Sequence, residues 1–120
     1  MGMAGRLGLL AATLAEALLG CSEGTEEFSD AGLSGRRTYQ NLCIACHHPD
    51  PHLAGILGPP LAGASLELLE AKVLRAAYPP EYTPKRSTES MPAFATLGEK
   101  LPGLVAYLAE VRSESRAAGD

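Results

Sequence analysis

The strongest chemical signal in the chain is the stretch Cys43-Ile44-Ala45-Cys46-His47. A pair of residues separates the cysteines, and the histidine follows the second cysteine directly. This spacing lets both thiols add across the vinyl groups of a haem, and it lets the adjacent imidazole turn to the iron. The motif therefore predicts one covalently attached haem c, held through Cys43 and Cys46, with His47 as an axial ligand of the iron.

Other interpretations of the motif are weaker. Zinc would need His48 and His52 to complete its ligands, but the loop between Cys46 and His48 is far shorter than the loops of zinc modules. A thioredoxin-type redox pair needs a strand before it and a helix after it, and the sequence shows no alternating strand pattern. Haem is therefore the favoured partner of these thiols.

Around the motif, the sequence has helical patterning in three places. We expect helices at about 34–43, from the residue after Ser65 to the prolines at 79–80, and over 101–111, with Ser34 as the first N-cap. Pro102 falls in the first turn of the last helix, where a missing N–H does no harm. Apolar residues at helical spacing mark the second and third helices: Leu66, Leu69, Val73, Leu101, Leu104, Val105, Leu108 and Val111. The expected fold class is all-α.

The apolar core of this domain is thin. The whole chain has 2 Phe and no Trp, and short helices joined by proline- and glycine-rich loops bury little by themselves. A covalently held haem supplies the missing apolar bulk. We therefore expect about three helices wrapped around one covalent haem.

Met91 is the expected sixth ligand of the iron. It is the only methionine outside the first twenty residues, and it lies in Met91-Pro92-Ala93-Phe94. A thioether is a soft ligand that favours ferrous iron, so a His/Met pair raises the reduction potential. His52 is the rival ligand, and a methionine that only fills a core gap is the ordinary alternative.

With these residues, the range 34–112 resembles a class I cytochrome c. The family places a Gly-Pro-x-Leu segment about a dozen residues after the haem histidine, and Gly58-Pro59-Pro60-Leu61 stands there. The family also crosses its first and last helices through a glycine, a leucine and aromatic residues. The matching positions here are Gly35, Tyr39, Leu104 and Tyr107.

The resemblance has implications for fold and site. It implies a small class I cytochrome c fold in which Gly35 lets the first and last helices approach closely. It also implies that the carbonyl of Pro59 accepts the N–H of His47, which fixes the tautomer of the imidazole. The loop before the methionine often binds the haem propionates in this family, so Tyr82, Lys85 and Arg86 are candidates for those contacts; a solvated loop is the alternative.

The first twenty residues are expected to be an export signal. An apolar run over 7–19 follows Arg6 and ends in Leu-Leu-Gly before Cys21, which resembles a bacterial lipobox with Cys21 as the lipid attachment site. The run is short for a membrane span, and it contains Glu16, a charge that export signals usually avoid. A cleaved signal, an uncleaved anchor and a misread amphipathic helix are the alternatives.

The remaining segments are polar. Residues 22–33 are rich in Ser, Gly, Thr and acids, which predicts a flexible acidic tether, and residues 113–120 predict a fraying polar tail. The cytochrome domain is expected over 34–112. From the export signal and the lipid attachment site at Cys21, we expect the protein in the periplasm or on the outer face of a bacterial membrane, anchored there through lipid.

The charge pattern limits the partners. The net charge is −4. The sequence has no block of basic residues that could contact the phosphates of a nucleic acid, so we expect no nucleic-acid partner. We expect one-electron transfer by a carrier or a small haem subunit, without catalysis by the chain itself. Redox partners of this kind include a cytochrome complex, a terminal oxidase or a dehydrogenase. A haem enzyme or a gas or redox sensor with an open sixth site is the alternative.

Overall fold

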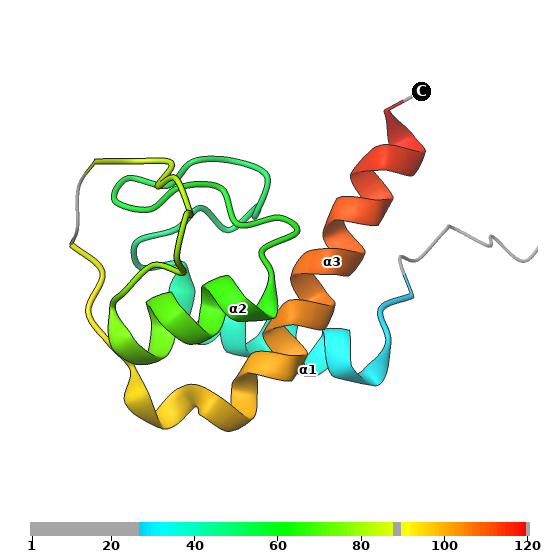
Figure 1. The fold of residues 1–120 in the computed structure, drawn as a ribbon. Coiled ribbons are helices and arrows are strands. Elements are labelled where there is room, and N and C mark those ends of the chain that lie inside the picture. Colours follow the sequence, from blue (N-terminus) through cyan, green and yellow to red (C-terminus); the bar gives the residue numbers. More distant parts are fainter. Residues whose placement is uncertain (1–26, 88–89, 120) are drawn as a thin grey trace, which may run out of the picture.

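The computed structural model describes residues 27–87 and 90–119. Within these ranges the chain forms helices and loops and no strand, so the expected all-α class is confirmed for the described residues. The predicted signal segment, the lipid attachment site Cys21 and residues 22–26 of the predicted tether lie outside them. Figure 1 shows the long α3 crossing α1, with α2 beside them.

The first helix begins earlier than predicted. Helix α1 (Asp30–Thr38) is capped by Ser29, whose hydroxyl accepts the N–H of Gly32, and it continues as the π-helical segment η1 (Tyr39–Cys43). The predicted N-cap at Ser34 is therefore wrong, and the predicted tether ends too late. The polar composition of this segment predicted a tether, but the Ser29 cap and the acidic Asp30 in the first turn stabilise a helix start there.

The second helix begins where predicted but ends earlier. The hydroxyl of Ser65 accepts the N–H of Leu68 and caps α2 (Leu66–Leu69), which continues as the π-helical segment η2 (Glu70–Leu74). Ala76 then adopts a φ of 52°, which ends the helix before the prolines at 79–80. Leu69 and Val73 are buried as expected, whereas Leu66 is exposed.

The third helix is longer than predicted. A 3₁₀ segment, η3 (Ala95–Lys100), leads into α3 (Leu101–Ala118), with Pro102 in the first turn. Residues 113–118, which the sequence predicts to be a fraying polar tail, continue this helix. None of the helices in the described ranges is long and apolar enough to cross a membrane.

The core lies where α1 and η1 cross α3. A Cβ on Gly35 would overlap the carbonyl oxygen of Gly103, so only glycine permits this approach of the two backbones. The ring centroid of Tyr39 lies 5.6 Å from that of Tyr107, and the ring centroid of Phe28 also lies 5.6 Å from that of Tyr107. The N-terminal segment is thereby packed onto α3.

A long irregular segment, residues 44–64, contacts α3 at Leu108 and Val111. Its backbone is held at several points rather than by a helix: the carbonyl of Pro51 accepts the N–H groups of Leu61 and Ala62, and the N–H of Gly63 donates to the carbonyl of Leu108 at 2.8 Å. These bonds satisfy loop groups that would otherwise be buried without partners. The segment can therefore support a site although it has no regular secondary structure.

Candidate functional site

A cavity of about 220 Å³ lies between this irregular segment, η2, the segment before η3, and α3. Its wall is mainly apolar. Cys43, Cys46, His47 and Met91 all line it. The folded chain thus brings the Cys43–His47 motif and Met91, the predicted sixth ligand, to one space.

Both cysteines of the motif are free and half-buried. Cys43 closes η1, and its carbonyl accepts the N–H of Cys46 at 3.2 Å and of His47 at 2.9 Å. This turn directs the chain from helix to loop within the motif. Burial raises the pKa of the Cys43 thiol to about 11, so this thiol stays neutral at physiological pH and lacks the lowered pKa of a dithiol redox centre.

His47 is buried, with 8% of its surface exposed. Its Nδ1 lies 3.0 Å from the carbonyl oxygen of Pro59. Because a carbonyl only accepts, Nδ1 carries the proton of the neutral ring and donates it, which leaves the lone pair on Nε2. Burial lowers the pKa of His47; the bond to Pro59 opposes this shift, and the nearby Arg86 cation adds to it. The ring is therefore neutral, oriented and able to ligate a metal through Nε2.

A tight loop, residues 55–58, packs against His47. The carbonyl of Cys46 accepts the N–H groups of Leu57 at 3.2 Å and Gly58 at 2.9 Å, and Gly55 donates to the carbonyl of Gly58 at 2.9 Å. A Cβ on Gly58 would overlap the imidazole of His47. The glycine in the Gly58–Leu61 segment is thus required by contact with the histidine ring.

Met91 reaches the cavity from the segment that precedes η3. It is partly buried and packs against the core. The N–H of Phe94 donates to the carbonyl of Val73 at 2.6 Å, which fixes this segment to η2. Met91 is therefore held at the cavity wall by main-chain attachment close to it.

The three predicted propionate contacts also line the cavity. Lys85 donates to the carbonyl of Pro60 at 2.8 Å, and Arg86 donates to the carbonyls of Gly55 at 2.8 Å and Ile56 at 3.3 Å. Both cations therefore attach their own loop to residues 55–60. Their contact with propionates stays a prediction.

Lys72 and Tyr78 are among the lining residues that sequence reasoning did not name. Tyr78 stacks on Tyr82 with ring centroids 5.5 Å apart, and the ammonium of Lys72 lies 4.1 Å from the centroid of Tyr78. With Lys85 and Arg86, Lys72 makes three cations on the cavity wall, and no Asp or Glu of the described chain lines it. Nothing in the helical pattern around Lys72 distinguished it from a solvated lysine.

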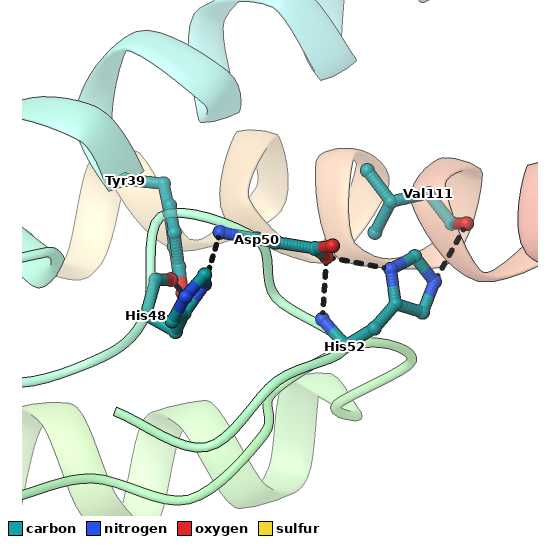
Figure 2. Close-up of polar contacts among 5 residues, drawn as sticks. All are labelled: Tyr39, His48, Asp50, His52 and Val111. Carbon is teal, nitrogen blue, oxygen red and sulfur yellow. Dashed lines mark hydrogen bonds and ion pairs between the residues drawn. The ribbon is translucent and has the colours of Figure 1, made fainter. Parts of the chain in front are cut away.

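Neither His48 nor His52 lines this cavity; Figure 2 shows that both contact Asp50. His48 accepts the N–H of Asp50 through Nδ1 at 2.9 Å. His52 contacts Asp50 through Nδ1 and the carbonyl of Val111 through Nε2. Among residues 27–87 and 90–119, no group of three or more His, Cys, Asp or Glu side chains is arranged to hold a metal ion. The described residues therefore give no support to a zinc site, nor to His52 as a cavity ligand.

Comparison with known proteins adds no assignment. No family model matches the chain, and no curated protein or solved structure is significantly similar to it.

Proposed function

We propose that this chain binds one haem c covalently through Cys43 and Cys46, ligates its iron with His47 and Met91, and transfers single electrons. The observation that carries the proposal is the shared cavity: the motif and Met91, far apart in sequence, line one apolar space. The resemblance to the class I cytochrome c family supports the same assignment. On this proposal, the cavity wall belongs to a cytochrome c fold closed around the haem.

The donor set fits this group. Both thiols are unpaired and available for thioether bonds, and the bond from His47 to Pro59 leaves a nitrogen lone pair for iron. A thioether from Met91 completes a low-spin ligand pair of mixed softness. Zinc modules instead gather further Cys or His ligands within a short distance, which this site lacks in the described chain.

The residues of this chain would contribute orientation and exclusion of water. When bound, the haem supplies a one-electron ferric/ferrous couple. The Pro59 carbonyl keeps the His47 ring in one orientation, and the apolar wall lowers the cost of rearranging solvent when charge changes. Lys72, Lys85 and Arg86 provide positive charge for carboxylates at the cavity.

The setting of this activity is part of the proposal. An export signal that ends at Cys21 would deliver the chain to the periplasm or the outer membrane face, and a lipid on Cys21 would hold it there. The redox partners would be a cytochrome complex, a terminal oxidase or a dehydrogenase. The chain itself would be a carrier or a haem subunit rather than an enzyme.

An optical spectrum of the full chain, purified after export, tests the proposal in oxidised and reduced forms. We expect a low-spin c-type spectrum and the far-red charge-transfer band of iron–thioether ligation. The C43A/C46A double variant should lose covalent haem, whereas H52Q should keep both features. Absence of haem in the unaltered chain would refute the proposal.

The same spectrum separates the alternative function. Haem without the charge-transfer band, together with rapid binding of added cyanide, would indicate an open or labile sixth site. Such a result would favour a haem enzyme or a gas or redox sensor over an electron carrier.

A further inference from the structure

The cations on the cavity wall have different partners. Lys85 and Arg86 donate to backbone carbonyls within residues 55–60. Lys72 instead places its ammonium 4.1 Å from the centroid of the Tyr78 ring, and no oxygen of the described chain accepts a hydrogen bond from it. An ammonium has three N–H donors. Lys72 can therefore turn its donors to an acceptor inside the cavity, whereas the other cations already have acceptors.

The chain reverses directly after η2, and this reversal brings Tyr78 back against Lys72. The N–H of Ala76 donates to the carbonyl of Lys72 at 3.1 Å, and the N–H of Ala77 donates to the carbonyl of Ala71 at 3.0 Å. Ala76 has a φ of 52°, a left-handed position that glycine usually fills. Because alanine stands there, contacts of the surrounding residues must hold the reversal in place.

A second reversal stacks Tyr82 on Tyr78. The N–H of Tyr82 donates to the carbonyl of Pro79 at 3.2 Å, and Glu81, within this turn, has a φ of 64°. The rings of the two tyrosines lie 5.5 Å apart between centroids and only 10° from parallel. A left-handed residue other than glycine thus precedes each tyrosine, and strained backbone of this kind concentrates at ligand clamps.

The stacked rings fix where the charge of Lys72 lies. Lys72, Tyr78 and Tyr82 are all half-buried, and all of them line the cavity. The face of an aromatic ring attracts a cation, so the ammonium is held at the wall rather than extended into solvent. No Asp or Glu of the described chain lines the cavity, so an anionic group inside it would meet this charge without an acid as competitor.

We propose that Lys72, positioned by Tyr78 and Tyr82, is the cation that binds a carboxylate of the group held in this cavity. The inference rests on the proposed haem, whose only carboxylates are its propionates. Lys85 and Arg86 then serve mainly to attach their loop to residues 55–60. Lys72 gives the cavity a preference for a porphyrin with free carboxylates over a neutral porphyrin of the same shape.

The test compares the dissociation constants of haem and of haem dimethyl ester, measured on the full chain that carries C43A/C46A. This chain cannot form thioether bonds, so it binds both compounds reversibly, and only haem carries free carboxylates. We expect K72Q to weaken haem binding about tenfold, the size of one charge-assisted hydrogen bond in a partly exposed position, and to change ester binding less than about twofold. K72R should keep most of the preference for haem. K100Q removes a lysine that does not line the cavity and should leave both constants unchanged.

Variants of Tyr78 test the positioning of Lys72. Y78L keeps the lysine and an apolar side chain but removes the ring beneath the ammonium, so part of the preference for haem over its ester should be lost. Y78F keeps the ring and should restore the preference. A purely structural role of the tyrosine would weaken haem and ester binding equally, and that result would overturn the positioning role.

The covalently loaded chain with both cysteines provides a second measurement that does not depend on reversible binding. Loss of a cation at the cavity wall favours the more positive ferric iron, so K72Q should shift the ferric/ferrous equilibrium about threefold towards the ferric form. An unchanged equilibrium, or equal loss of haem and ester affinity in K72Q, would overturn the role of Lys72 while haem binding stands. A chain that binds neither porphyrin and carries no covalent haem would refute the proposed function itself, so the two failures are distinguishable.

Discussion

The imidazole Nδ1 of His47 lies 3.0 Å from the carbonyl oxygen of Pro59, twelve residues along the chain. Gly58, directly before that proline, lies against the face of the same ring. Gly58 thus packs against the imidazole, and the carbonyl of Pro59 orients it. The contact with the ring explains the glycine at position 58, and the group of Pro59 that holds the ring is its main-chain carbonyl.

This relationship predicts the effect of Gly58→Ala. The new methyl group would overlap the ring, so the ring must move and the contact with Pro59 must lengthen. We expect a loss of about 1–3 kcal/mol in the free energy of unfolding, measured by urea titration. A shift in the visible spectrum should accompany it if His47 ligates iron. Unchanged stability would show that the loop can yield without affecting His47.

The helix crossing makes a second prediction. Gly35→Ala would drive a methyl group into the backbone at Gly103, and backbone cannot give way as a flexible side chain can. We expect about 3 kcal/mol of destabilisation, measured by thermal or urea unfolding. Gly98→Ala is the matched control because nothing lies within 4 Å of its added Cβ, and it should be neutral or slightly stabilising.

The start of α1 gives a third prediction. Ser29→Ala removes the hydroxyl that caps Gly32 and that also donates to Glu110 of α3, so we expect a loss of about 1 kcal/mol in unfolding free energy. Ser34→Ala, an exposed position inside the helix, should be neutral or slightly stabilising because alanine is the better helix former. The opposite order would contradict a helix that starts at Asp30.

Sequence patterning located the helices better than it located their ends. The apolar spacing after Ser65 predicted the second helix, yet the end of that helix depends on the positive φ of Ala76, which has no local sequence signal. The start of α1 was missed because Phe28 and Ser29 are stabilised by Tyr107 and Glu110 on α3. Such contacts between distant segments cannot be read from a local pattern.

The candidate site was predictable where it depends on chemistry carried by residue type and spacing. The Cys43–His47 motif, Pro59 and Met91 were named from sequence, and the structure places them around one cavity. Lys72 and Tyr78 were not named. Their place on the wall depends on where η2 ends and how the following loop folds back, and neither is encoded by a motif.

Acid should weaken the loop that contains Asp50. Its carboxyl pKa is lowered from 3.8 by the N–H and then the ring of His52, so the ionised form stabilises the fold above about pH 4, and this contribution is lost as the pH falls through the lowered pKa. Urea unfolding between pH 6 and pH 2.5 should show a smaller acid loss in D50N than in the unaltered chain. The same loss in both would rule out a contribution from this pair.

The proposed ligation by Met91 gives the sharpest test of the site. Among the described residues that line the cavity, Met91 is the only one with sulfur besides the two cysteines. Met91→Ala removes this thioether, which favours ferrous iron. We expect covalent haem to remain, the far-red band to vanish, and the midpoint potential to fall by on the order of 0.1 V, within the roughly 0.8 V range that axial ligands span. Redox titration and cyanide binding measure both changes.

Phe94→Leu is the matched control for this substitution. Phe94 lines the same cavity and follows Met91 closely, but its side chain has no atom that can bind iron. The control should keep the charge-transfer band and resist cyanide, with at most a small change in potential from altered packing. An M91A chain that behaves like F94L would leave Met91 as a packing residue, and the sixth ligand would then have to come from elsewhere on the wall.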